Sequence, residues 1–205
     1  MQRLFLILTT IILMLTNANA QSEKTVDQAN GLNVGQEAPL FEASDAAGNK
    51  FKLKNEIKNQ PVVVIFYRGY WCPVCNKHLS QIQDSLQLIM EKGVKVLAIS
   101  PEKPEYLDKM SEKSGAEFTL LYDENNDIAK AYDVNFKPSS KQLFTYNVIL
   151  GADMKNTHSD DSQQLPIPAT YLINKDGKIV WRQFDRDYHN RASVKDILKA
   201  VDNLQ

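Results

Sequence analysis

Two cysteines, Cys72 and Cys75, are the residues with the clearest chemical potential, and the sequence has no third. A pair spaced C-x-x-C can close a small disulfide ring without moving the elements that hold it, so the spacing suits reversible oxidation. The preceding run, Val62–Tyr67, is apolar and rich in β-branched residues, which is typical of a strand buried on both faces. After the pair, as far as Gly93, apolar residues recur at the spacing of one helix face, namely Leu79, Ile82, Leu86 and Ile89.

The cysteines are therefore expected where a buried strand passes into a helix. Pro73 suits the first turn of that helix, where a proline loses no useful backbone donor. Unpaired N–H groups and the helix dipole at this place favour a thiolate over a thiol. The sequence thus predicts a redox-active pair in which at least one thiol has a depressed pKa.

Other interpretations of the pair have less support. Two inert cysteines at a strand end would be ordinary core residues. A zinc site would need more ligands, and His78 is the only candidate nearby. Covalent haem attachment would need a histidine directly after Cys75, where Asn76 stands. Redox chemistry explains the pattern best.

Two strings, FYRGYWCPVCNKHL and the later IPATYLINKDGKIVW, resemble the peroxiredoxin-like AhpC/TSA family of the thioredoxin superfamily. The resemblance runs from about Val34 to Leu204. It implies an α/β, thioredoxin-like fold with a central mixed β-sheet flanked by helices and an N-terminal β-hairpin extension. It also implies that Pro168 is the cis-proline found beside the cysteine pair of such proteins; a trans proline opening a strand is the alternative. It implies no cofactor and no metal.

The sequence departs from the typical peroxiredoxin pattern in two places. Cys72 stands where those proteins have threonine or serine, which aligns Cys75 with their peroxidatic cysteine. The arginine that they carry near the start of the late strand, and that helps to hold peroxide and thiolate, is missing here.

Two arginines are candidates for that missing role. Arg68, just before the cysteines, could supply it; alternatively it is a surface arginine stacked on Tyr70 or Trp71. Arg182 is a weaker candidate.

We expect a thiol-dependent peroxidase. The Cys75 thiolate would attack a hydroperoxide and become a sulfenic acid, Cys72 would condense with it, and an external dithiol of thioredoxin type would reduce the resulting disulfide. The alternative is an exported thiol–disulfide oxidoreductase, in which Cys72 attacks a disulfide substrate and Cys75 resolves the mixed disulfide. A binding protein that keeps the fold without turnover is a third possibility, against which the intact pair argues.

The composition fits one globular domain, expected over residues 34–205. The chain has 205 residues, of which 43% are hydrophobic, and its 24 basic residues nearly balance its 25 acidic ones. This balance, without a long basic run, gives no support for nucleic-acid binding.

The first twenty residues have the pattern of a signal peptide. Arg3 precedes an apolar run, Leu4–Leu15, and Ala18-Asn19-Ala20 is a small-residue cleavage signal. We therefore expect export to the periplasm or secretion after cleavage, with membrane association only through this segment. An uncleaved anchor is the alternative. Residues 21–33 are polar and without periodicity, which predicts a flexible lead-in.

The remaining elements are expected to build a sheet around the first strand. Residues 94–100 form a second buried strand, parallel to the first through a right-handed βαβ unit, so the cysteines lie at the carboxyl end of the sheet. Residues 139–164 are expected to be a partly irregular insertion near the site, whose His158 is solvated or, alternatively, catalytic. Further expected elements are a hairpin turning at residues 46–50 with Phe51 and Leu53 on its second strand, helices at 105–113 and 126–132, a strand at 118–122, a second hairpin turning at 174–177, and a final helix begun by Ser193.

Overall fold

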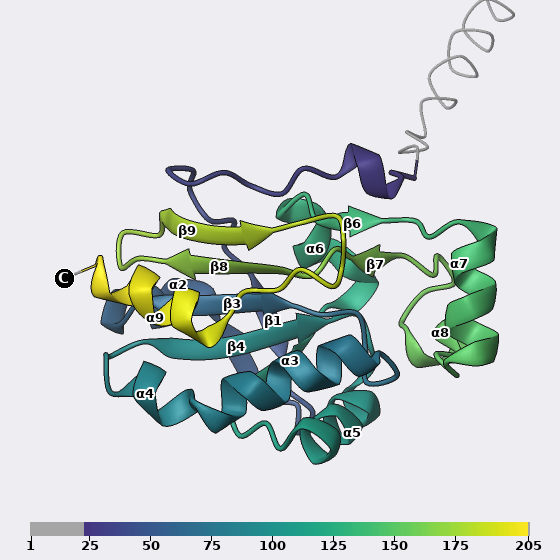
Figure 1. Cartoon of the computed structure of the whole chain (residues 1–205), viewed down its shortest axis with the longest axis horizontal. Helices are drawn as coiled ribbons and strands as arrows, with labels where there is room; N and C mark the ends of the chain where they lie inside the picture. The colour runs from purple at the N-terminus through teal and green to yellow at the C-terminus, as the bar shows by residue number, and fades with distance from the viewer. Residues whose placement is uncertain (1–22, 205) are drawn as a thin grey trace, which may run out of the picture.

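A computed structural model describes residues 23–204, which form a mixed seven-stranded sheet with helices on both faces (Figure 1). The strand order is β2-β1-β5-β4-β3-β8-β9. These strands are β1 (Glu42–Ser44), β2 (Lys50–Lys52), β3 (Val62–Phe66), β4 (Lys95–Ser100), β5 (Thr119–Tyr122), β8 (Ala169–Ile173) and β9 (Ile179–Phe184). A separate short pair joins β6 (Asn135–Phe136) to β7 (Leu165–Pro166).

The centre of the sheet has the predicted parallel arrangement. Strand β3 pairs in parallel with β4, β4 pairs in parallel with β5, and β8 runs antiparallel to β3. Every residue of β3 is buried, because its apolar side chains alternate between two hydrophobic clusters, one on each face of the sheet. The predicted thioredoxin-like fold is confirmed.

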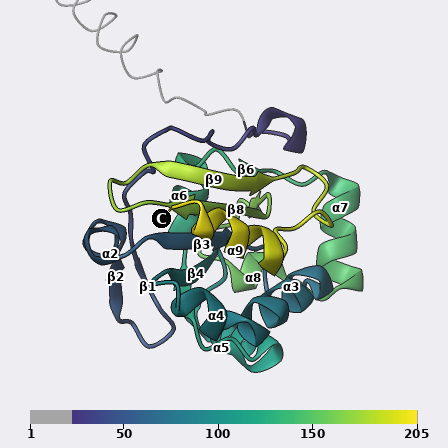
Figure 2. The ribbon, with the colours of Figure 1, turned by 60° about the vertical axis from the view of Figure 1, so that its left-hand side comes forward.

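The helices divide between the two faces (Figures 1 and 2). One face packs against α3 (Pro73–Asp84), α4 (Leu86–Met90), α5 (Pro104–Ser114) and α9 (Val194–Asp202). The other packs against α2 (Leu53–Asn59) and α6 (Asp127–Ala131).

Two local predictions need correction. The helix expected to run to Gly93 is divided at Ser85, which leaves the helical conformation with φ −118° and ψ 10°. Leu53, expected on the second strand of the first hairpin, instead begins α2, in which it packs with Ile57 beneath the sheet. Burial of these two side chains outweighs the alternating pattern that suggested a longer strand.

The lead-in packs on the domain over its described part, residues 23–33. Figure 1 shows it running beside β9. Its Ala29 is fully buried, and Arg182 on β9 donates hydrogen bonds to the carbonyl oxygens of Asn30, Gly31 and Leu32. The contacts are made mostly by backbone groups, which explains why a polar, aperiodic sequence gave no sign of them. Arg182, the weaker of the two candidate arginines, therefore binds the backbone of the lead-in.

The predicted signal peptide and its cleavage point after Ala20 lie outside the described residues. Within residues 23–204, no helix is long and apolar enough to cross a membrane.

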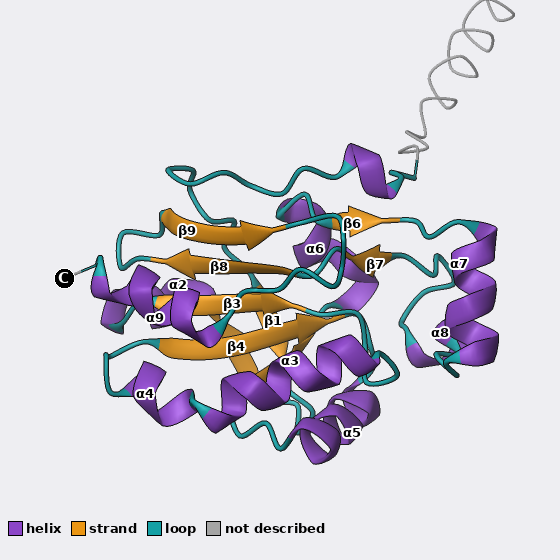
Figure 3. Cartoon of the chain, viewed as in Figure 1, coloured by secondary structure: helices purple, strands orange, loops and turns teal. Residues whose placement is uncertain are grey.

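The insertion at residues 139–164 is more regular than predicted. It contains α7 (Ser140–Phe144), a π-helical turn (Thr145–Ile149) and α8 (Met154–Thr157), which lie at the end of the sheet where β3 ends and α3 begins (Figure 3). The prediction that His158 is solvated is wrong. Its side chain is 1% exposed, because the chain after α8 returns to the sheet and its backbone bridges to Glu102.

Candidate active site

The two cysteines are adjacent thiols at the carboxyl end of β3. Cys72 is the N-cap of α3, and its sulfur accepts a hydrogen bond from the Cys75 backbone N–H at 3.4 Å. The two sulfurs lie 2.8 Å apart, and both side chains are fully buried. A helix that begins between the cysteines therefore holds them close enough to join after oxidation.

Arg68 is directed at the sulfur of Cys72. Its Nη2 donates to Cys72 Sγ at 3.0 Å, and its Nη1 donates to the Tyr146 hydroxyl at 3.0 Å. The guanidinium lies 3.9 to 5.3 Å from the ring centroids of Tyr188, Tyr146 and Trp71. With 2% exposure, Arg68 is buried within the site, so the alternative of a surface arginine is wrong. The aromatic faces replace part of the hydration that the cation loses.

Arg191 is directed at the sulfur of Cys75, and the sequence gave no indication of it. Its Nη2 lies 3.6 Å from Cys75 Sγ, although 116 residues separate the two in the chain. Arg191 belongs to the connection between β9 and α9, a polar stretch without a recognisable motif. Only the folded arrangement brings it to the pair.

The two thiols are shifted in opposite directions. Burial alone would raise the pKa of Cys75, but the hydrogen bond with Cys72 and the charges of Arg191 and Arg68 outweigh it and hold that pKa well below its ordinary value. The hydrogen bond with Cys75, burial and the charge of Cys75 raise the pKa of Cys72, with Arg68 opposing them. These opposite shifts favour the thiolate form at Cys75 over that at Cys72.

One residue connects the two arginines. The ring of Tyr188 stacks on Arg68, and its backbone carbonyl accepts a hydrogen bond from Arg191 Nε at 2.5 Å. The C-terminal connection thus contacts Cys75 through Arg191, and it contacts Arg68, the partner of Cys72, through Tyr188.

Trp71, a predicted site residue, is buried beside Arg68, and the turn before it contacts a buried carboxyl group. The Glu102 carboxylate accepts a hydrogen bond from the Tyr70 backbone N–H at 2.8 Å, and burial raises the pKa of Glu102 well above its usual range. A Cβ added to Gly69 would lie 2.4 Å from Trp71 Nε1 and 2.5 Å from Glu102 Oε1, so only glycine fits there. Glu102 was not anticipated from the sequence.

Pro168 lies at the same end of the sheet, but its predicted cis bond is wrong. All peptide bonds of residues 23–204 are trans, including the bond before Pro168. The residue is buried and directly precedes β8, as the alternative interpretation of a strand-opening proline requires. Ile65 pairs with Thr170 where β3 and β8 run antiparallel. Two residues further on, the same register places Pro168 opposite Tyr67, near the start of the loop that leads to the cysteines.

His78, the residue considered for zinc, faces the protein backbone instead. Its Nε2 lies 3.0 Å from the carbonyl oxygen of Ala192. Among residues 23–204, no group of three or more histidine, cysteine, aspartate or glutamate side chains is arranged to hold a metal ion.

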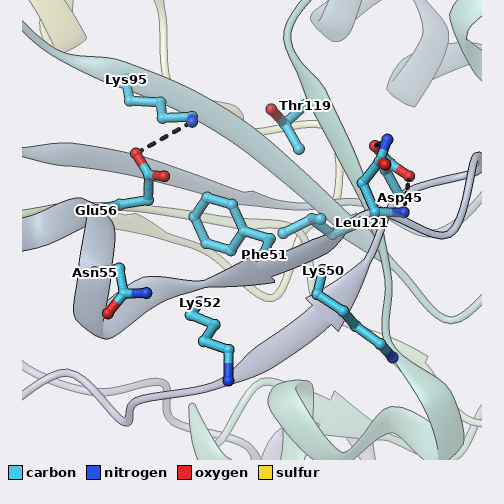
Figure 4. A pocket seen from close by; sticks show the side chains of 10 residues that line it. Asp45, Lys50, Phe51, Lys52, Asn55, Glu56, Lys95, Thr119 and Leu121 are labelled. Atoms are coloured by element: carbon cyan, nitrogen blue, oxygen red, sulfur yellow. Dashed lines mark hydrogen bonds and ion pairs between the residues drawn. The ribbon is translucent and has the colours of Figure 1, made fainter.

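A pocket at the other end of the sheet contains no comparable chemistry. Figure 4 shows this cavity of about 290 Å³, where the side chain of Phe51 is flanked by a salt bridge of 3.1 Å between Lys95 and Glu56. Lys95 and Thr119 are the first residues of β4 and β5, whereas the cysteines follow the last residue of β3. The candidate active site is therefore the cysteine pair.

Comparison with known proteins gives consistent matches. A sequence model of the AhpC/TSA family matches residues 34–182. The chain is 34% identical over 163 residues to the peroxiredoxin Bcp of Escherichia coli, covering 78% of this chain and 92% of that one. It is also 26% identical over 171 residues to the thiol-disulfide oxidoreductase ResA of Bacillus thuringiensis, covering 83% of this chain and 79% of that one.

Solved structures agree with the fold. The peroxidoxin BcpB of Mycobacterium tuberculosis superposes with a TM-score of 0.66 at 19% identity, covering 85% of this chain and 99% of that one. With most of its length matched by the family model, the chain belongs to the AhpC/TSA family, in the peroxiredoxin-like part of the thioredoxin superfamily.

Proposed function

We propose that this protein is a thiol peroxidase that reduces hydroperoxides through Cys75, with Cys72 as the resolving cysteine. Its broader class, a thiol-dependent oxidoreductase, follows from membership of the family. The observation that carries the finer proposal is that Arg191 lies at Cys75 and its charge adds to that of Arg68, whereas Cys72 has Arg68 alone, so the pKa of Cys75 is the one held low.

In the first step the Cys75 thiolate attacks one oxygen of the hydroperoxide. The O–O bond breaks, Cys75 becomes a sulfenic acid, and the departing alkoxide or hydroxide takes up a proton. Arg191 Nη1 has no hydrogen-bond partner among residues 23–204, so it is free to donate to a peroxide oxygen. A cation beside the departing oxygen stabilises the negative charge that develops there.

In the second step Cys72 attacks the sulfenic sulfur of Cys75. The S–S bond forms, and the hydroxide that leaves combines with the proton of Cys72 as water. The distance of 2.8 Å between the sulfurs supports direct condensation. Because the sequence has no third cysteine, an external dithiol of thioredoxin type must supply the two electrons that restore both thiols.

Thiol–disulfide exchange remains a second candidate. The likeness to ResA and the adjacent pair favour it. In that reaction Cys72 would be the first nucleophile, and its raised pKa argues against this order.

We also propose that the protein is exported, to the periplasm or out of the cell, after cleavage behind Ala20. The support is the sequence alone: Arg3, the apolar run Leu4–Leu15 and the small residues before Gln21. Amino-terminal sequencing of exported material should begin at Gln21. Recovery of full-length, membrane-bound protein alone would contradict the proposal.

Peroxide consumption coupled to NADPH through a thioredoxin system tests the activity. The wild type should turn over hydrogen peroxide or an organic hydroperoxide, Cys75→Ser should be inactive, and Cys72→Ser should react once and stop. Absence of turnover in the wild type, together with rapid reduction of disulfide substrates, would favour the second candidate.

A further inference from the structure

The connection that carries Arg191 is attached to the cysteine helix at one further point, His78. Cys75 lies in the first turn of α3 and His78 one turn later, and both are buried. From there the His78 ring meets the carbonyl oxygen of Ala192, the residue next to Arg191. Cys75 and Arg191 are thus joined both directly and through this second contact.

The chemistry of the contact fixes the tautomer of the ring. A carbonyl oxygen can only accept a hydrogen bond, so the Nε2 of His78, 3.0 Å away, must carry the proton. Its Nδ1 is buried and has no partner among residues 23–204, so it is the unprotonated nitrogen. A second proton there would be buried without an acceptor and close to the Arg191 cation. Burial and then Arg191 accordingly lower the pKa of His78 to about 4. The ring therefore stays a neutral donor across the physiological range.

We propose that His78 is a positioning residue: its hydrogen bond to Ala192 holds the β9–α9 connection so that Arg191 stays against the sulfur of Cys75. Ala192 is 3% exposed and is followed directly by Ser193, the N-cap of α9. The bond therefore fixes the connection just before the rigid helix begins. Without it, the Arg191 side chain would rest on its remaining bond to the Tyr188 carbonyl. The inference rests on the proposed role of Cys75 as the reacting thiolate.

The position of Arg191 should be visible in the reactivity of the Cys75 thiol. The experiment therefore uses a Cys72→Ser background, in which Cys75 is the only cysteine. The rate of alkylation by iodoacetamide, measured against pH, gives the thiolate pKa. His78→Phe keeps an aromatic ring but has no donor, and it should raise that pKa by about one unit or more, as expected when an opposite charge moves away. His78→Gln places an N–H where Nε2 stood and should restore most of the wild-type value.

Ser80→Ala is the matched control. Ser80 also lies on α3, and its hydroxyl also donates to a backbone carbonyl, that of Ser114 on α5, at 3.0 Å. Since that contact leads away from Arg191, its loss should leave the Cys75 pKa unchanged. An equal rise in Ser80→Ala and His78→Phe would mean that the helix is merely loosened, and would overturn the proposal.

A double-mutant cycle tests whether His78 acts through Arg191. In an Arg191→Met background, His78→Phe should produce almost no further rise, because the charge that it positions is gone. Two full, additive rises would contradict the proposal. Should His78→Phe fail to fold, ¹⁵N NMR of the wild-type ring decides instead: a proton on Nε2 between about pH 5.5 and 8 supports the inference, and a proton on Nδ1 overturns it.

The outcome is independent of peroxide turnover. If these pKa shifts occur but no variant or wild type consumes peroxide, the proposed function fails and the positioning role stands. If peroxide is consumed but His78→Phe leaves the thiolate pKa unchanged in folded protein, the positioning role alone fails.

Discussion

The two cysteines are three residues apart in sequence and 2.8 Å apart in space, yet their surroundings differ. Cys72 lies beside Arg68, a buried cation from its own loop enclosed by three aromatic rings. Cys75 lies within the first turn of α3 beside Arg191, which comes from the far end of the chain. The difference shows how two similar thiols can acquire different acidities: the charge of a distant arginine adds to that of Arg68 in lowering the pKa of Cys75, whereas Arg68 alone opposes the raised pKa of Cys72.

Removing Arg191 should have the largest effect on this difference. Arg191→Met deletes a charge-assisted contact worth about 1.5–3 kcal/mol, which corresponds to roughly a ten- to hundredfold slower attack on peroxide near neutral pH. Single-turnover oxidation followed by stopped flow measures the rate. Arg186→Met is the control, because Arg186 lies on the same connection but contacts Val26 and Asn30. Equal slowing in both variants would show that the connection, and not the cation, matters.

Removing Arg68 should affect the other sulfur more. Without its lowering influence the pKa of Cys72 rises further, so disulfide formation in Arg68→Met should slow by about tenfold, as for a pKa change of one unit. Attack by Cys75 should slow less than in Arg191→Met. Sulfenic acid should therefore persist longer after one equivalent of peroxide, as trapping with dimedone at timed intervals can measure. A variant that slows attack and condensation equally would remove the distinction between the two arginines.

Crowding of the turn before the cysteines should lower the stability of the fold. Gly69→Ala forces a methyl group against Trp71 and Glu102 and should cost about 1–3 kcal/mol of stability, the usual range for overpacking. Urea unfolding measures the loss. Gly48→Ala is a useful comparison, since no atom lies within 4 Å of the added Cβ and its positive φ alone is strained. A smaller loss at Gly69 than at Gly48 would show that the turn has room to adjust.

The smallest effect is expected from the hydroxyl group of Tyr146. Tyr146→Phe removes one hydrogen bond to Arg68 but keeps the ring, so the free energy of unfolding should fall by about 1 kcal/mol. The rate of peroxide attack by Cys75 should stay within about twofold of wild type, the equivalent of a few tenths of a kcal/mol. A larger loss of rate would indicate that the Arg68 environment controls Cys75 as well.

Sequence reasoning located the cysteine pair, the strand and helix around it, and the sheet, because these depend on local apolar periodicity. Arg68 and Trp71 were also found, since they are neighbours of the cysteines in the chain. Arg191 and Glu102 were missed, because each reaches the site only through tertiary packing. His158 was misjudged for the same reason: burial after α8 depends on where the chain returns. The contacts of the lead-in with Arg182 could not be predicted, because they are made by backbone carbonyls, which every sequence has.

The central claim is that Cys75 attacks first and Cys72 resolves. Treating Cys72→Ser and Cys75→Ser with one equivalent of hydrogen peroxide in the presence of dimedone, then locating the adduct by mass spectrometry, tests it most directly. The account predicts rapid, stoichiometric labelling of Cys75 in Cys72→Ser. Because the pKa of Cys75 is lowered, this rate should hardly fall as the pH is reduced from 8 until that lowered pKa is reached. Labelling of Cys72 in Cys75→Ser should be no faster than that of an ordinary thiol. Faster labelling of Cys72 than of Cys75 would contradict the account.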